Sequence, residues 1–258
     1  CTNDACGAPI SIAAIAFGLI FGGSLVGLLL GRILPEHHSS TESLGVVRLS
    51  MGLIATITAL VLSLVTSSAK TGFDTENATV KQTAASILTF DRMLANYGPE
   101  ATPIRQSLRT ILTEKAAKIW PEEGIGSVDA AAVDTNVGEH IVDQILALQP
   151  QTDAQRWYQS QALDLCSQIL QTRWIVYGGS GGSIPTLFLT VIIGWLVLLF
   201  GSFGLFAPLN GTVVGALLIG TMTVATSIFL ILEMDEPFNG LLKVSSDPIQ
   251  YTLARLSH

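Results

Sequence analysis

The sequence predicts an all-α membrane protein, in which four transmembrane helices frame a helical extramembrane domain between the second and the third. Two observations lead to this fold class. Only 13% of the 258 residues are charged and the mean hydropathy is +0.52, whereas about a quarter of an ordinary soluble domain is charged. The charges are also unevenly placed, because 9 basic and 13 acidic residues lie from Lys70 to Arg173, between two nearly uncharged flanks.

Three uncharged stretches supply the predicted spans. They hold 27 residues between Asp4 and Arg32, 21 between Arg48 and Lys70, and 59 between Arg173 and Glu233. A helix needs about 20 apolar residues to cross the hydrocarbon core, and glycines and a proline at 201–211 divide the longest stretch. We therefore expect spans at 10–33, 46–69, 184–204 and 212–232. They are helices rather than barrel strands, because the apolar runs lack polar alternation.

Glycines recur at a spacing of four residues in the first and fourth spans. They are Gly18 and Gly22, then Gly23, Gly27 and Gly31, and finally Gly211 and Gly215. Small residues at this spacing form a groove that another helix backbone can approach closely. We expect them to pack against a helix, of the same chain or of another. The alternative is that they reflect only the general frequency of glycine in membrane helices.

The second span carries a stripe of small and hydroxyl-bearing residues, which ends on a lysine. Its members are Gly52, Thr56, Ala59, Ser63, Thr66 and Lys70. Steps of four and three place them on one face of a helix, and bulky residues such as Leu60 and Leu64 lie opposite. The stripe is either a helix-packing seam or the lining of a water-filled path around a symmetry axis. No span carries a charge at mid-depth, which argues against proton pumps and most coupled transporters.

The polar middle of the chain predicts a helical domain. The second helix continues past the membrane until Gly98 and Pro99 stop it, and further helices fit 100–119, 130–148 and 152–177. Thr152 and Asp153 are candidates for the N-cap of the last of these. The predicted division is therefore 1–70 for the first two spans, 71–178 for the extramembrane domain, 179–236 for the last two spans and 237–258 for a C-terminal tail.

Charged residues gather where the second and fourth spans end. Asp74 follows Lys70, and Glu233, Asp235 and Glu236 close the fourth span. They are ordinary solvated helix ends, partners of Lys70, or, in an oligomer, a ring that attracts cations. Basic residues favour the cytoplasmic side of membrane ends. Five of them flank the spans on the side of the middle domain against two on the other, so we expect this domain in the cytoplasm.

No motif in the chain predicts catalysis, a metal site or a cofactor. Residues 178–182 match GxSxG, but a helix precedes them and Pro185 follows, which is typical of a hinge and not of a nucleophile elbow. Adjacent His37 and His38 in a short loop lack metal-ligand spacing. The net charge of −7 argues against nucleic acid as a partner. Membrane lipids, inorganic ions and further copies of the chain are the partners that we expect.

Several motifs resemble the bacterial bestrophin-like domain family. The residues that carry the resemblance are Arg32–His38, Ser67–Lys70 with Phe73 and Asp74, Asp91–Leu94 with Tyr97–Glu100, Ser183–Pro185, Phe203–Pro208, and Ile231–Phe238 with Ser245 and Ser246. They are spread over nearly the whole chain. Where the family often has a basic residue after Ala-Pro, this chain has Leu209.

The resemblance implies a similarity to bestrophins, which are pentameric anion channels with four spans per subunit. Their second span lines the pore, and a cytosolic helical domain lies between spans two and three. A homo-oligomeric ion channel of a bacterial inner membrane is therefore expected, with the stripe of the second span around its axis. The alternative is a non-conducting membrane scaffold or accessory subunit, whose stripe packs inside one protomer. Bestrophin pores carry aromatic and branched residues where this stripe is small and hydroxyl-rich, so the selectivity does not transfer.

Overall fold

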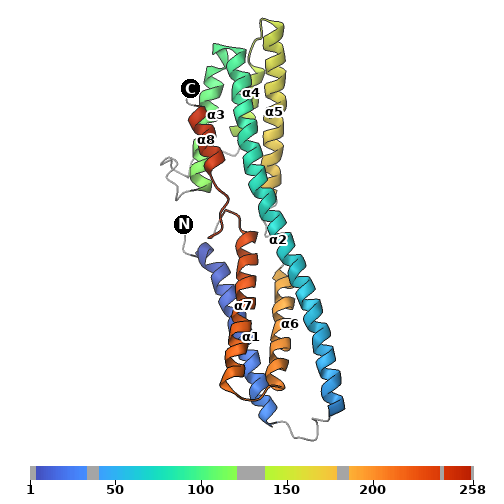
Figure 1. Ribbon diagram of the computed structural model, residues 1–258. Coiled ribbons are helices and arrows are strands. Elements are labelled where there is room, and N and C mark those ends of the chain that lie inside the picture. The colour runs from blue at the N-terminus through green and yellow to red at the C-terminus, as the bar shows by residue number, and fades with distance from the viewer. Residues whose placement is uncertain (1–3, 34–40, 121–136, 179–185, 239–240, 257–258) are drawn as a thin grey trace. The chain divides into compact units, whose positions relative to one another are not determined.

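The computed structural model describes residues 4–33, 41–120, 137–178, 186–238 and 241–256, and it confirms the all-α membrane fold. Its regular elements are helices throughout the described ranges (Figure 1). Four of them are long and apolar enough to span a membrane. The chain divides into two compact units, Cys1–Phe73 with Gly182–Leu242 and Asp74–Gly181 with Lys243–His258. The C-terminal residues thus belong to the same unit as the predicted extramembrane helices.

The first unit is built around three spans. Helices α1 (Asp4–Ile33), α6 (Thr186–Leu205) and α7 (Gly211–Asp235) pack together. Their buried core consists of Ala16, Ile20, Leu28, Ile192, Leu196, Phe200, Leu217 and Ile228. The apolar side chains provide length and hydrophobicity for the membrane, while close interdigitation of these residues holds the three helices to one another.

Helix α2 (Thr41–Tyr97) is a single helix of 57 residues that contributes to both units. In the first unit, Val61, Leu62 and Val65 pack against the core of α1, α6 and α7. The helix ends where Gly98 adopts φ of +133°, a conformation that L side chains rarely adopt. A short 3-10 helix, η2 (Pro99–Ala101), then leads into α3 (Thr102–Ile119).

The second unit contains the rest of α2 with α3, α4 (Val137–Leu146), α5 (Asp153–Gly178) and α8 (Asp247–Arg255). Its core includes Phe90 and Leu94 of α2 and Ile145 of α4, each at most 1% exposed. Asp91 of α2 is buried and pairs with Arg105 of α3 through both carboxylate oxygens, at 2.6 and 3.0 Å. A bidentate charge-assisted pair of this kind fixes the two helices relative to each other.

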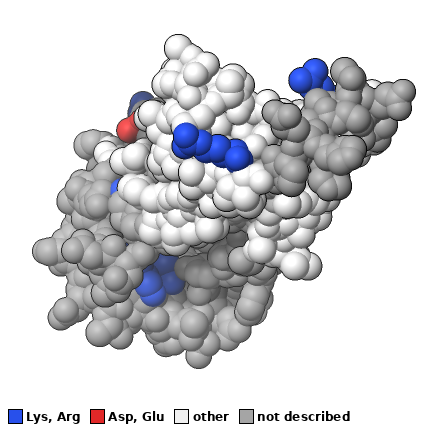
Figure 2. All heavy atoms as spheres, turned by 90° about the horizontal axis from the view of Figure 1, so that it is seen from below, with Lys and Arg blue, Asp and Glu red and all other residues white. Residues whose placement is uncertain are grey.

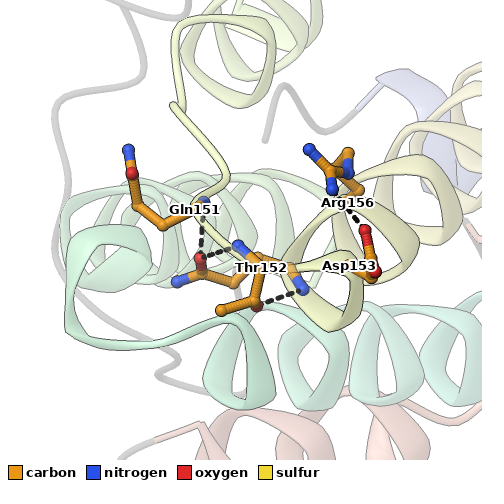
Figure 3. Close-up of polar contacts among 5 residues, drawn as sticks. Gln151, Thr152, Asp153 and Arg156 are labelled. Atoms are coloured by element: carbon orange, nitrogen blue, oxygen red, sulfur yellow. Dashed lines mark hydrogen bonds and ion pairs between the residues drawn. The ribbon is translucent and has the colours of Figure 1, made fainter.

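The start of α5 shows how sequence sets a helix boundary. The Thr152 hydroxyl accepts a hydrogen bond from the Gln155 backbone N–H at 3.2 Å, and the Gln155 side chain accepts bonds from the N–H groups of Gln151 and Thr152 (Figure 3). This reciprocal arrangement is a capping box. Asp153 forms an ion pair with Arg156 one turn later. The structure therefore agrees with Thr152 as the N-cap.

Some predicted elements can be compared with the structure, and others fall outside the described residues. The segment predicted as a C-terminal tail, 237–258, contains α8, a helix that the sequence analysis did not assign. The spans expected at 184–204 and 212–232 correspond to α6 and α7 within a few residues, and α6 holds Gly201 and Gly204 inside the helix. The first part of the helix expected at 130–148, His37 and His38, and most of the hinge at 178–182 lie outside the described residues.

Candidate functional site

All six residues of the predicted stripe on α2 are exposed in the single chain. The face of α2 that packs against its own chain is a neighbouring one, on which Thr58 and Ala69 are 3% and 1% exposed. Residues 58, 62, 65 and 69 follow helical spacing, and the stripe lies roughly a third of a turn away from them. The stripe therefore forms no packing seam with the described residues of its own chain.

The hydroxyl groups of the stripe are bonded to the backbone of their own helix. Thr56 Oγ1 donates to the Gly52 carbonyl oxygen and Thr66 Oγ1 to the Leu62 carbonyl oxygen, both at 2.8 Å. A hydroxyl has one proton and two lone pairs, so each oxygen can still accept a hydrogen bond from outside the helix. The exposed stripe thus offers hydrogen-bond acceptors between small side chains, which suits contact with water.

A second face of α2 is also exposed, but it is apolar. Leu53, Leu60 and Leu64 are each more than 60% exposed. In its most apolar stretch, only 6% of the α2 residues are buried, compared with 28% in each of the other three spans. The membrane part of α2 is therefore the span that the rest of its own chain covers least.

The charged residues at the ends of the spans occupy different environments. Lys70 and Asp74 are exposed on α2. Glu233 is 1% exposed, and its Oε2 accepts hydrogen bonds from the backbone N–H groups of Leu241 at 2.6 Å and Leu242 at 3.3 Å. The expectation of an ordinary solvated helix end is therefore wrong for Glu233. Sequence reasoning missed this role because the acceptor and its donors are separated by a turn of unpredicted geometry.

Asp235 and Glu236 follow Glu233 and are half-buried. Burial raises the pKa of Glu236 above its usual value of 4.5, and the negative charges of Asp235 and Glu233 raise it further. The end of α7 is thus a site where negative charge is concentrated. Within the parts of the chain that the structure describes, no group of three or more His, Cys, Asp or Glu residues is arranged to hold a metal ion.

The glycines expected to pack helices fall into two groups. A Cβ built on Gly27 would collide with the Gly201 carbonyl oxygen, and one on Gly31 with the Leu205 carbonyl oxygen. Gly23 likewise faces Val197, so this series lies against α6.

On the α6 side, a Cβ on Gly204 would collide with the Ser24 carbonyl oxygen, so glycines of both helices permit the close approach. Gly201 and Gly204 were not identified as packing residues from the sequence. They are three residues apart rather than four, and they belong to the glycine- and proline-containing stretch 201–211 that was interpreted as the division between two spans. By contrast, a Cβ on Gly18, Gly22, Gly211 or Gly215 would meet nothing within 4 Å.

Among the described residues, few charged groups lie on the surface seen from below, where α1 ends and α2 begins in Figure 1. Figure 2 shows separated Lys and Arg groups on this surface, with few acidic groups. Arg32 near the end of α1 and Arg48 near the start of α2 are both exposed. Acidic residues, in contrast, concentrate at the end of α7.

The fold resembles solved structures of bacterial bestrophin homologues. One variant of the homologue from Klebsiella pneumoniae is 16% identical and superimposes with a TM-score of 0.66, covering 97% of this chain and 97% of that one. A second variant is 17% identical with a TM-score of 0.62, covering 92% and 98%. A structure of the homologue solved by zinc phasing is 17% identical with a TM-score of 0.60, covering 92% and 95%.

These structural likenesses establish the fold. No curated protein matches the chain. At the level of sequence families, the model of the bestrophin-like domain matches residues 18–249, which include most of the first span, the other three spans and the helices between the second and third. The chain therefore belongs to the bestrophin-like domain family.

Proposed function

We propose that the chain is one subunit of a homo-oligomeric ion channel, in which α2 lines an axial pore. The observation that carries the proposal is the exposure of α2. Its most apolar stretch is 6% buried within the chain, although it is long and apolar enough to lie in a membrane. A span that its own chain leaves uncovered must meet lipid, another subunit or water. The proposed pore-lining residues are Gly52, Thr56, Ala59, Ser63, Thr66 and Lys70.

The two exposed faces of α2 suit different surroundings. The bulky face that includes Leu60 and Leu64 suits lipid or the apolar flank of a neighbouring subunit. The stripe has small side chains, and hydroxyl oxygens with free lone pairs suit a water-filled path. Membership of the bestrophin-like family supports the same assignment, including a pentamer as the expected oligomer. The passing ions are small inorganic ions of unassigned charge.

For the location we propose a bacterial inner membrane, with the helical unit of α3, α4 and α5 on the cytoplasmic side. The distribution of basic residues at the ends of the spans supports this orientation. It can be tested by placing single cysteines at the exposed positions Ser160 and Arg48. Labelling of intact spheroplasts with an impermeant maleimide should modify the second position and spare the first.

Ion flux from liposomes tests conduction and the role of the stripe together. The purified protein should release entrapped ions, and Ser63→Trp should abolish or strongly reduce the flux, because an indole group fills a narrow path. Leu64→Trp is the matched control, since Leu64 is 63% exposed on the other face, and its flux should persist. A monomer in solution, or a Ser63→Trp channel as active as the control, contradicts the axial pore. An intact oligomer without flux would instead support the non-conducting scaffold.

A further inference from the structure

Two exposed leucines follow the end of α7. Leu241 is 72% exposed and Leu242 is 42% exposed, and α7 before them is one of the four helices that are long and apolar enough to span a membrane. Exposed apolar residues that are scattered singly over a surface are normal. These two are adjacent, and their backbone is fixed near the end of a span, so their position indicates what covers them.

The backbone of the two leucines is fixed by Glu233 of α7. Glu233 Oε2 accepts hydrogen bonds from the N–H groups of Leu241 and Leu242, and Glu233 is 1% exposed. A buried carboxylate is costly unless charge-assisted hydrogen bonds replace its hydration, so the carboxylate and the backbone at 241–242 stabilise each other. All three residues belong to the unit of the membrane spans, which gives the leucines a defined position relative to α7.

The length of α7 gives the depth of the two leucines in a membrane. Its 25 residues, at a rise of 1.5 Å each, reach about 37 Å, which exceeds the hydrocarbon core of about 30 Å. With the excess shared between its two ends, the last turn of α7 lies where the acyl chains meet the headgroups. Glu233 belongs to this last turn, and its hydrogen bonds hold the backbone of Leu241 and Leu242 at the same level.

We propose that Leu241 and Leu242 form an interfacial lipid anchor, in which Glu233 holds two apolar side chains at the boundary between acyl chains and headgroups. Apolar side chains presented at this boundary enter it by about 5–10 Å. The ligand is the glycerol end of the acyl chains of bilayer lipids. The anchor extends the exposed apolar residues of α7, such as Leu230, beyond the end of the helix. Because Asp235 and Glu236 are close by in the sequence, zwitterionic headgroups suit this site better than anionic ones.

The anchor goes beyond the proposed channel and would serve a scaffold equally, because it depends on the span of α7 and not on a pore. Two other surroundings of the leucines are conceivable, namely water and a further copy of the chain. The three cases differ in which small molecules reach the side chains. Lipid admits quenchers attached to acyl chains, water admits dissolved ions, and a subunit contact excludes both, so accessibility distinguishes them.

Fluorescence quenching of the full chain in phosphatidylcholine vesicles tests the anchor. A nitrobenzoxadiazole label is attached to Leu241→Cys or Leu242→Cys, in a chain whose three native cysteines are replaced by serine or alanine. We expect strong quenching by lipid with a nitroxide near the glycerol end of the acyl chain, weaker quenching by a nitroxide at the chain end, and a loss of quenching by iodide.

Two further positions calibrate these quenchers. Ile219→Cys lies near the middle of α7, where the residue is 68% exposed, and its label should respond most to the deep nitroxide. Ser160→Cys is exposed on α5, and its label should respond to iodide alone. If iodide alone quenches the labels at 241 and 242, the leucines lie in water. If no quencher reaches them, another subunit covers them. Either result overturns the proposal.

The part played by Glu233 is tested by adding Glu233→Ala to the chain labelled at Leu241→Cys. The hydrogen bonds that fix the turn are then lost, so quenching by the shallow nitroxide should fall and quenching by iodide should rise. Glu236→Gln, a change at a neighbouring carboxylate outside these bonds, should alter neither. Unchanged quenching in Glu233→Ala overturns the proposal that Glu233 holds the anchor. If this variant does not fold, Glu233→Gln weakens the same bonds by removing the charge and allows the same comparison.

Discussion

Replacing Gly27 by alanine tests the close contact between α1 and α6. At this position the new methyl group would collide with the carbonyl oxygen of Gly201 and lie close to the Leu205 nitrogen. All of these atoms belong to the backbone of α6, so no change of side-chain rotamer can make room. The two helices must separate or distort, and the interdigitated core beside them loses contacts.

The expected magnitude combines two opposing effects. Alanine is favoured over glycine inside a helix by up to about 1 kcal/mol. Overpacking of a tight interface costs about 1–3 kcal/mol. The upper half of this range applies because the new methyl group clashes with backbone atoms, which cannot move aside as a side chain can. Gly27→Ala should therefore lower the free energy of unfolding by about 1–2 kcal/mol, net of the gain in helix propensity.

Gly22→Ala is the matched control, because it makes the same change in the same helix where a Cβ meets nothing within 4 Å. Gly215→Ala provides a second control on α7. Unfolding can be followed by loss of helical circular dichroism during titration with a denaturing detergent, with oligomer size checked in parallel. If Gly27→Ala is as stable as Gly22→Ala, the α1–α6 contact is not as close as described and the reasoning fails.

Three further predictions concern other parts of the chain. Asp91→Asn breaks the bidentate pair with Arg105 and should lower the free energy of unfolding of the unit of α3, α4 and α5 by up to about 3 kcal/mol. This is the low end of the cost of breaking a buried pair, because the Arg105 side chain stays 26% exposed. Denaturant titration measures the change, and an unchanged midpoint refutes the prediction. Glu236→Gln should raise the melting temperature at pH 7, because the raised pKa means that the folded state disfavours the charged form. This gain should vanish below about pH 4.5, where the carboxyl is protonated in both states; a gain that persists there points to another cause. Cys166 is buried with a raised thiol pKa, so it should react with maleimide only after unfolding, and rapid reaction of the native protein would contradict this.

The membrane spans could be predicted from the sequence because their signal is simple. Uncharged stretches bounded by Asp4, Arg32, Arg48 and Lys70 leave little choice about where α1 and α2 cross. The capping residue Thr152 was also predictable, since a capping box depends only on local spacing. These features are set within a few residues or by total hydrophobicity, so one sequence is enough to reveal them.

Features that depend on distant parts of the chain were not predictable in the same way. Lipid is as apolar as leucine, so hydrophobicity does not distinguish the face of α2 that packs on its own chain from the face that does not. Glu233 accepts hydrogen bonds from the backbone of Leu241 and Leu242, eight and nine residues away in the sequence. The indole N–H of Trp120, the residue after α3, donates to the Val244 carbonyl oxygen, 124 residues away. Helix α8 had a local signal, because Pro248 and Asp247 follow Ser246 at its start, but its short apolar pattern is weak without the surface that buries it.

The continuity of α2 also constrains how the length of the chain can vary. Within the second unit, α2 buries residues 84, 87, 90, 91, 94 and 97, so one face of the helix points into the core of that unit. One residue inserted within this stretch would turn the buried positions beyond it by about 100°, whereas seven residues, or two turns, would restore the phase to within about 20°. Relatives whose α2 differs in length within this stretch should therefore differ by two whole turns, or carry a local bulge that restores the phase.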